Sequence, residues 1–407
     1  MINFNYKSRE SKLSGVKCFF ILGFTLLLMQ TGLTQEKKWV FSGYVKNMQT
    51  GLIFNDAFPD LQQLKLVDTF LLDQLIHHRL NAKWYINDKW TFQAGLRNRL
   101  FTGDLVKFTP NYGQQTDDAS NDYFDLSILW LDRPSMVIHS VFDRLFLDYT
   151  NGNWEIRVGR QRINWGISNV WNPNDVFNAF SFTDFDYEEK PGSDAIRVKY
   201  YTGFASSVEV AAKAADNIKE SVIAGLWKFN QWNYDFQLLS GWVKNEWVVG
   251  GGWAGNIKNM GFQGELSYFI PPEDQVDPAF SMTVGGDYTF KNSAFISGGL
   301  LYNSEGSTMG GSSTQLFTFE LSARNLYPYR WSIFTQFNYP VTPLTNVGMA
   351  IIYSPIKTHS LFLNPMWTYS IKENWDLNLI GQIVFNKEEN LYKSPLQAIF
   401  LRLKYSY

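Results

Sequence analysis

Cysteine is almost absent from this chain of 407 residues. The one cysteine, Cys18, lies inside a segment that we predict is removed, and the remaining chain therefore has no disulfide framework and no thiol chemistry. Long apolar runs are also scarce. The main one, residues 19–29 (FFILGFTLLLM), is shorter than the roughly 20 residues that a membrane-spanning helix needs.

The N-terminal segment has the pattern of a secretory signal. Four basic residues precede the apolar run, and the small residues Gly32 and Thr34 follow it. We predict cleavage after Thr34 or Gln35, which divides the chain into a signal peptide, residues 1–35, and a single domain, residues 36–407.

The residue types that carry most catalysis are few. The chain has four histidines and only 18% charged residues, and it shows no nucleophile elbow, zinc-ligand spacing or phosphate loop. We therefore predict no enzymatic activity, no cofactor and no metal site. The formal net charge of −2 also argues against a nucleic-acid partner.

What the chain has instead is 17% aromatic residues and an alternation of apolar and polar side chains from end to end. In residues 72–86 one face carries Leu72, Ile76, Leu80, Ala82, Trp84 and Ile86, and the other carries Asp73, His77, Arg79, Asn81 and Lys83. A turn at 87–89 and a second alternating segment from Trp90 complete a hairpin.

The same alternation returns at 145–158, 282–300, 331–339, 347–353 and 375–385. It predicts an all-β fold: a transmembrane, antiparallel, up-and-down β-barrel of about 18 strands, within a range of 16–20, in the outer membrane. A soluble sandwich is disfavoured, because the polar faces carry several charges, as a wet lumen would.

Aromatic side chains recur at predicted strand ends beside short turns, as expected at a membrane–water boundary. They are Trp84, Trp90, Tyr149, Trp154, Phe229, Trp232, Tyr288, Phe290, Tyr353 and Trp375. Short turns are predicted to alternate with long extracellular loops, including 102–135, 166–192 and the Gly/Ser-rich segment 303–315.

The last residues, 399–407, alternate and end on an aromatic. They resemble the terminal strand that the barrel-assembly machinery recognises. The predicted partners are accordingly that machinery, outer-membrane lipid and a solute whose identity the sequence does not specify.

Residues 156–166 (IRVGRQRINWG) and 171–178 (WNPNDVFN) carry a more specific pattern. The GRQ-x-x-NWG stretch with a following Asn-Pro resembles a broad group of porin-like outer-membrane barrels, including the alginate-export type. The resemblance implies that this segment climbs the wall and enters an infolding loop, with Gly159, Arg160, Gln161, Asn164, Trp165 and Gly166 in the pore region.

The charges near this stretch suggest a constriction. We predict that 166–192 folds into the lumen, and that a slip in alternation between Val158 and Ile163 marks a β-bulge. The predicted pore-lining residues are Arg97, Arg99, Arg157, Arg160, Gln161, Arg162, Asn164, Trp165, Arg197 and Lys199. The predicted constriction-loop residues are Asp184, Asp186, Glu188, Glu189 and Asp194.

Two interpretations of these charges remain open. Wall arginines opposite loop carboxylates would create a transverse field across the lumen, or the pairs would simply hold the loop down. The stretch 184–189 is also a weak candidate for calcium. The sequence favours a porin-like channel for passive passage of small or polymeric solutes. A surface-assembly or adhesion barrel and, less favoured, a barrel hydrolase are the alternatives.

Overall fold

The structure is a computed structural model, and the residues that it describes are 38–54, 70–118, 123–179, 186, 188–215, 217–272, 277–309, 319, 321–388 and 391–407. The predicted signal peptide, the loop tip at 310–318 and Asp184 lie outside the described residues. Among the described residues, no helix is long and apolar enough to cross a membrane.

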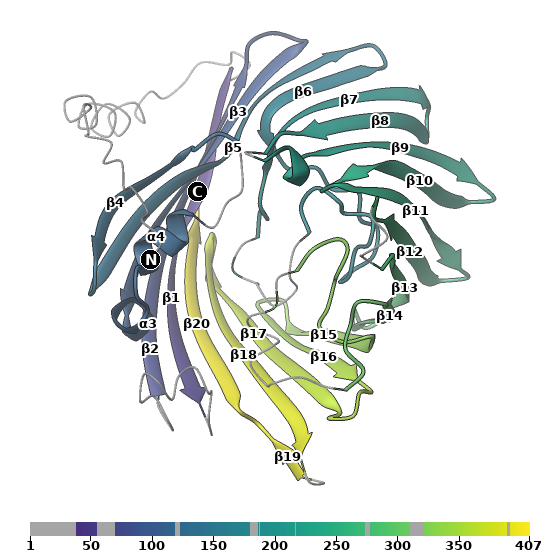
Figure 1. Cartoon of the computed structure of the whole chain (residues 1–407). Helices are drawn as coiled ribbons and strands as arrows, with labels where there is room; N and C mark the ends of the chain where they lie inside the picture. The colour runs from purple at the N-terminus through teal and green to yellow at the C-terminus, as the bar shows by residue number, and fades with distance from the viewer. Residues whose placement is uncertain are drawn as a thin grey trace, which may run out of the picture. The chain divides into compact units, whose positions relative to one another are not determined.

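Strands account for most of the described chain (Figure 1). In the first half they are β1 (Trp39–Phe54), β2 (Phe70–Tyr85), β3 (Trp90–Gly103), β4 (Ser127–Arg133), β5 (Met136–Asn151), β6 (Trp154–Gln161), β7 (Ser193–Gly203), β8 (Ser206–Lys213), β9 (Val222–Gln231) and β10 (Tyr234–Val243). In the second half they are β11 (Glu246–Ile257), β12 (Met260–Ile270), β13 (Ala279–Thr289), β14 (Phe295–Asn303), β15 (Trp331–Thr342), β16 (Thr345–Ser354), β17 (Ser360–Lys372), β18 (Trp375–Glu388), β19 (Leu391–Lys393) and β20 (Leu396–Ser406). The helices within the described ranges are the short α3 (Asp104–Phe108), α4 (Tyr112–Asp117) and the 3-10 turn η1 (Ile218–Glu220).

These strands form a closed antiparallel barrel. Each strand pairs with the next along the chain, except that β3 pairs with β5 and β18 with β20, and the ring closes where β1 pairs with β20. The purple β1 and the yellow β20 lie side by side in Figure 1. The ring has 18 strands, which confirms the predicted fold and strand number. The short β4 and β19 only extend pairings of β5 and β18.

Alternation along each strand separates a lumen face from an outer face. In β8, Val208 and Val210 are exposed on the outer face, whereas Ser207, Glu209 and Ala211 between them are buried. An outward apolar face suits lipid, and closure leaves no unpaired strand edge in it.

Aromatic pairs join neighbouring strands at one end of the barrel. Trp39 stacks on Trp84, and Trp154 lies against Tyr200, with ring centroids 4.9 Å and 4.6 Å apart. These pairs lie at the end where connections are short, as predicted for a girdle. Tyr353 is an exception, because β16 ends beside it and the chain continues into the longer connection at 355–359.

The connections at the opposite end are mostly long, with one exception. Only Lys244 and Asn245 join β10 to β11, and both have positive φ, 48° and 68°. Two successive positive φ values define a type I′ turn, whose twist matches that of a hairpin. The predicted long loop 102–135 contains α3, α4 and β4.

The predicted bulge in β6 is wrong. The pairing of β6 with β5 and β7 runs without a register shift from Trp154 to Gln161. The slip in alternation instead marks the end of the strand, where the chain leaves the wall. Gly159 has φ +118°, and a Cβ there would lie 2.3 Å from the carbonyl oxygen of Leu145, so this position requires glycine.

Candidate pore and constriction

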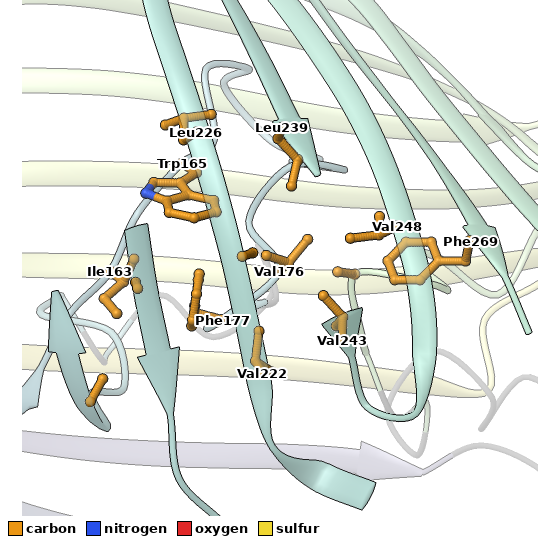
Figure 2. Close-up of a cluster of buried hydrophobic side chains, with 14 of the residues drawn as sticks. Ile163, Trp165, Val176, Phe177, Val222, Leu226, Leu239, Val243, Val248 and Phe269 are labelled. Atoms are coloured by element: carbon orange, nitrogen blue, oxygen red, sulfur yellow. The ribbon is translucent and has the colours of Figure 1, made fainter. Parts of the chain in front are cut away.

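The segment after β6 contacts the inner face of the barrel over many strands. Ile163, Trp165, Val176 and Phe177 pack against inward side chains of the wall (Figure 2). These wall residues are Ala195, Ala211, Val222, Ala224, Leu226, Leu239, Val243, Val248, Phe269 and Ala279. Between these residues of the segment, Trp171 packs edge-on against Phe334 of β15 and against Tyr327, which lies in the connection that precedes β15. Burying this apolar surface holds the segment against the wall.

Two buried carboxylates of the wall fix the same segment by hydrogen bonds. Trp165 Nε1 donates to Glu209 of β8 over 2.6 Å. Glu265 of β12 accepts from the backbone N–H groups of Ile167, Ser168 and Asn174. A carboxylate that accepts several N–H bonds forms charge-assisted contacts, which are stronger than neutral ones.

The Asn-Pro-Asn stretch adds neutral contacts beside Glu265. Ser267 Oγ donates to the carbonyl oxygen of Pro173 over 2.7 Å, and Asn174 Nδ2 donates to that of Gly251 over 2.9 Å. Gln237 of β10 donates to the carbonyl oxygen of Trp165 over 2.7 Å. Strands β8 and β10–β12 thus bind residues of the two stretches 156–166 and 171–178 that carry the porin-like sequence pattern.

Within the segment, Arg162 connects the start of the stretch 162–179 to its end. Its guanidinium pairs with Asp175 and donates to the carbonyl oxygen of Asn178. Burial raises the pKa of Asp175 to about 6, although Arg162 acts in the opposite direction. Asn164 accepts a bond from Arg162 and is exposed.

Residues 186–190 contact a different part of the wall, formed by β20, β1, β2 and β5. Asp186 pairs with Lys46 of β1 over 2.8 Å, and Glu188 pairs with Lys404 of β20 over 2.7 Å. Glu189 lies 3.4 Å from Arg79 of β2. Because residues up to 179 contact β7–β15, the two described stretches of this segment are held by different parts of the inner wall.

The charges of these carboxylates are stabilised in place. Burial alone would raise the pKa of Asp186, but its hydrogen bond with His77 and the charge of Lys46 outweigh burial and lower it. For Glu188, burial is likewise outweighed, here by Lys404 and by the charges of Lys46 and Arg402, so its pKa is also lowered. Both carboxylates stay ionised at neutral pH.

The basic partners differ from those that we predicted. Lys46, Arg79, Arg144, Arg402 and Lys404 contact 186–190, and none of them was among the predicted pore-lining residues, although the alternation placed Arg79 on the polar face of its strand. Their inward direction follows from the alternation in β1, β2 and β20, but their proximity to this loop follows only from barrel closure, which brings the two ends of the chain together.

The predicted arginines on β3 lie on the lumen face beside this contact. Arg97 Nε donates to His77 Nε2 over 3.1 Å, and Arg99 is hydrogen-bonded to His139 Nδ1 over 2.9 Å. His77 and His139 also contact Asp186 and Asp117. In the described part of the chain, no serine hydroxyl is hydrogen-bonded to either imidazole.

Three other predicted residues lie near the short-turn end of the lumen. Arg157 donates to Asp148 over 2.8 Å, Arg197 pairs with Glu155, and the Lys199 ammonium lies 4.7 Å from the ring centre of Tyr201. They face the lumen but lie closer to the short-turn end of the barrel than the loop contacts do.

Two predicted positions need correction. Asp194 belongs to β7 rather than to the loop, and it pairs with Arg160 over 2.8 Å. Both have the parity of the outward residues Val158 and Ile196, whereas their neighbours Gln161 and Ala195 face inward. The backbone of Phe124 covers the pair, donating to Asp194 and accepting from Arg160. Arg160 therefore does not line the pore. Within the described residues, no group of three or more potential ligands could hold a metal.

Comparison with known proteins gives likeness in fold alone. No family model matches the sequence, and no curated protein matches it. Acinetobacter baumannii OccAB4 superposes with a TM-score of 0.58 at 12% identity, over 92% of this chain and 99% of that one. A BenF-like porin from Pseudomonas fluorescens Pf-5 gives 0.58 at 12%, over 91% and 98%. Pseudomonas aeruginosa OccK5 (OpdH) gives 0.56 at 9%, over 91% and 98%.

The resemblance to alginate-export-type barrels remains a prediction, because none of these neighbours tests it. Closure into 18 strands, an apolar outer face and likeness to these porins together indicate an outer-membrane protein with a porin fold.

Proposed function

We propose that this protein is a passive channel for small solutes and that its lumen is narrowed by two stretches of chain, 162–179 and 186–190. The observation that carries the proposal is the contact of one segment with separate parts of the inner wall. Its first arm is held by Glu209 and Glu265, and its second by Lys46, Arg79 and Lys404. Such contacts leave a lumen that admits solutes but limits their size.

The charge around these contacts supports a preference for anions. Seven basic side chains face the lumen from β20, β1, β2, β3 and β5: Lys46, Arg79, Arg97, Arg99, Arg144, Arg402 and Lys404. Asp143, Asp186, Glu188 and Glu189 offset part of this charge. A charged surface between low-dielectric walls concentrates ions of the opposite sign.

Planar-bilayer recording with the purified barrel tests both statements. We expect single-channel steps, and in a KCl gradient we expect a reversal potential that indicates chloride preference. Asp186→Asn with Glu188→Gln should shift the reversal potential further toward anions and raise conductance. Glu220→Gln, which changes an exposed carboxylate on η1, is the matched control and should leave both unchanged.

Absence of steps in every salt, with a barrel that shows heat-modifiable mobility, would refute the channel. Steps that are identical in the double variant and the parent would place 186–190 outside the conducting path.

A further inference from the structure

The outer face of β1, β2, β3 and β5 differs from the rest of the barrel. It carries polar side chains where lipid-facing residues are expected: Asn47, Gln49, Gln74, His78, Asn98 and Ser140, hereafter the outer polar patch. Strand register places Gln49 beside Gln74, His78 beside Asn98, and Asn98 beside Ser140. These strands are neighbours in the ring (Figure 1).

The patch begins inside the apolar band. His78 lies six residues along β2 from the girdle residue Trp84, which corresponds to a height of roughly 15 Å at the usual strand rise and tilt. The apolar band of such barrels is about 25 Å tall. At the corresponding level, other strands present apolar or aromatic side chains: Ile223, Trp242, Trp247, Tyr268, Tyr302, Trp331 and Ile383.

A directed chain of hydrogen bonds joins the centre of the patch. Trp130 Nε1 donates to Ser140 Oγ over 2.9 Å, and Ser140 donates to Asn98 Oδ1 over 2.6 Å. Asn98 Nδ2 lies 3.1 Å from His78 Nδ1, which accepts its bond.

The chain continues to the C-terminal residue. His78 Nε2 donates to the Tyr407 hydroxyl over 2.9 Å, and that hydroxyl donates to the carbonyl oxygen of Arg79 over 3.1 Å. Every link has a donor and an acceptor when His78 is neutral with its proton on Nε2.

At the edge of the patch, fewer of the polar groups have hydrogen-bond partners. Asn47 Oδ1 accepts from Gln49 over 3.2 Å and from Gln74 over 3.4 Å. Within the described residues, the amide nitrogen of Asn47 and the amide oxygens of Gln49 and Gln74 make no hydrogen bond. Asn47 lies eight residues from Trp39, inside the apolar band, where an unbonded amide is costly because no partner replaces water, whereas Gln49 and Gln74 lie at the rim of the band. A protein surface would supply partners.

We propose that the outer polar patch is the contact surface between two copies of this chain related by a two-fold axis. A two-fold interface brings a surface against itself, so the surface must be self-complementary. Neutral amides meet this requirement because each both donates and accepts. None of the six patch residues is a carboxylate, lysine or arginine, so no oppositely charged partner is needed.

The flanking residues and the area agree with such an interface. Trp130 and Tyr407, at the two sides of the patch, are exposed aromatics of the kind enriched in interfaces. Over their whole length of roughly 50 Å, four strands at about 4.8 Å spacing present about 900 Å² per copy, so a standard interface of ~800 Å² per copy would extend beyond the patch along these strands.

Cysteine cross-linking in outer membranes tests the geometry. In a Cys18→Ser background, Gln49→Cys and Gln74→Cys are compared with Leu300→Cys, an outward position on β14. We expect a disulfide-linked dimer from the two patch positions, at least tenfold above the control. Mass spectrometry then identifies the cross-linked species. A cross-link to a different protein, or equal yields at all three positions, would overturn the proposal.

Copy number in lipid nanodiscs tests the energetics. Mass photometry should show two copies for the parent and for Thr335→Leu, which removes an outward hydroxyl on β15. His78→Leu with Asn98→Leu should give single copies. Should that variant lack heat-modifiable mobility, Gln49→Ala with Gln74→Ala, outside the hydrogen-bond chain, takes its place. A parent with one copy per disc, or patch variants that remain paired, would refute the interface.

Discussion

At the scale of single residues, buried carboxylates of the wall decide where the lumen segment lies. Glu265 is fully buried and accepts three backbone N–H groups, and Glu209 accepts the indole N–H of Trp165. A buried charge without partners is strongly unfavourable, so each carboxylate favours the arrangement that supplies its donors. Both act on the segment more specifically than the apolar contacts around them.

Replacing Glu265 by alanine should therefore release the Asn-Pro-Asn stretch. The variant loses acceptors for three N–H groups, and a hydrogen bond to a charged group contributes about 1.5–3 kcal/mol. We expect larger and noisier single-channel currents and faster proteolysis between residues 166 and 179. Gln263→Ala, a neighbouring inward position on β12, serves as the control. Unchanged currents and proteolysis in Glu265→Ala would show that the apolar contacts suffice.

The bond between Trp165 and Glu209 is a second residue-scale test. Trp165→Phe keeps a ring in the cluster but removes the donor, which should cost about 1–3 kcal/mol in the free energy of unfolding. A double-mutant cycle with Glu209→Ala, which removes the acceptor, measured by urea unfolding in lipid vesicles, gives the coupling energy of the pair. Additive effects of the two substitutions would contradict the contact.

At the scale of elements, residues 162–192 combine two kinds of attachment. The first arm, up to residue 179, is held by apolar packing and hydrogen bonds, and the second, 186–190, mainly by ion pairs. Of the two interpretations of the charges, the ion pairs support the one in which they hold the loop down, and the transverse field remains a prediction. The second arm should therefore be the one that responds to acid.

Acidification should release that second arm. Asp186 and Glu188 have lowered pKa values in the folded protein, so their stabilisation is complete above the ordinary carboxyl pKa and is lost as pH falls through the lowered values. Conductance should accordingly begin to rise below about pH 4, near the ordinary values for Asp and Glu, and should rise further as the pH falls toward the lowered values. Asp175 has the opposite sign, because its raised pKa makes its contribution largest at low pH and lost as pH rises through about 6.

The measurement is single-channel conductance between pH 7 and pH 3. Asp186→Asn with Glu188→Gln removes the titrating groups and should abolish the step below pH 4. A step of the same size in that variant would assign the titration to other groups.

At the scale of the whole molecule, closure depends on a close approach at the β1–β20 seam. Gly43 of β1 and Tyr407 exchange backbone hydrogen bonds of 3.0 Å. A Cβ at position 43 would lie 2.1 Å from the carbonyl oxygen of Arg79 and 2.7 Å from the Tyr407 hydroxyl. Tyr407 reaches β2 across this position, so the last residue joins three strands.

Gly43→Leu should accordingly impair closure, while the strands themselves keep their sequence pattern. We expect less of the folded, heat-modifiable species in outer membranes. We also expect this species to unfold at a lower temperature than it does in the parent. Gly51→Leu on the same outer face of β1, where a Cβ would meet only the flexible Phe70 ring, is the control and should assemble better. Equal assembly of the two variants would show that the seam tolerates a side chain. Recognition of this strand by the assembly machinery remains a prediction.

The sequence by itself determined the barrel. A period of two with charges on one face and apolar groups on the other is readable locally, because each strand of a one-layer wall meets lipid on one side and water on the other. Division of 372 residues by the usual length of a strand and its connection then leads to about 18 strands. The sequence also indicated that the alternation of a strand breaks within the GRQ-x-x-NWG stretch, residues 159–166.

Only the tertiary structure decided which charges meet. Lys46 and Lys404 lie at opposite ends of the chain and contact one loop near its middle, because closure makes the first and last strands neighbours. Likewise, Arg160 was predicted to line the pore, yet strand parity turns it outward against Asp194. Alternation specifies that two faces exist, but which face a residue takes near a strand end depends on where the strand stops, and contacts distant in sequence set that point.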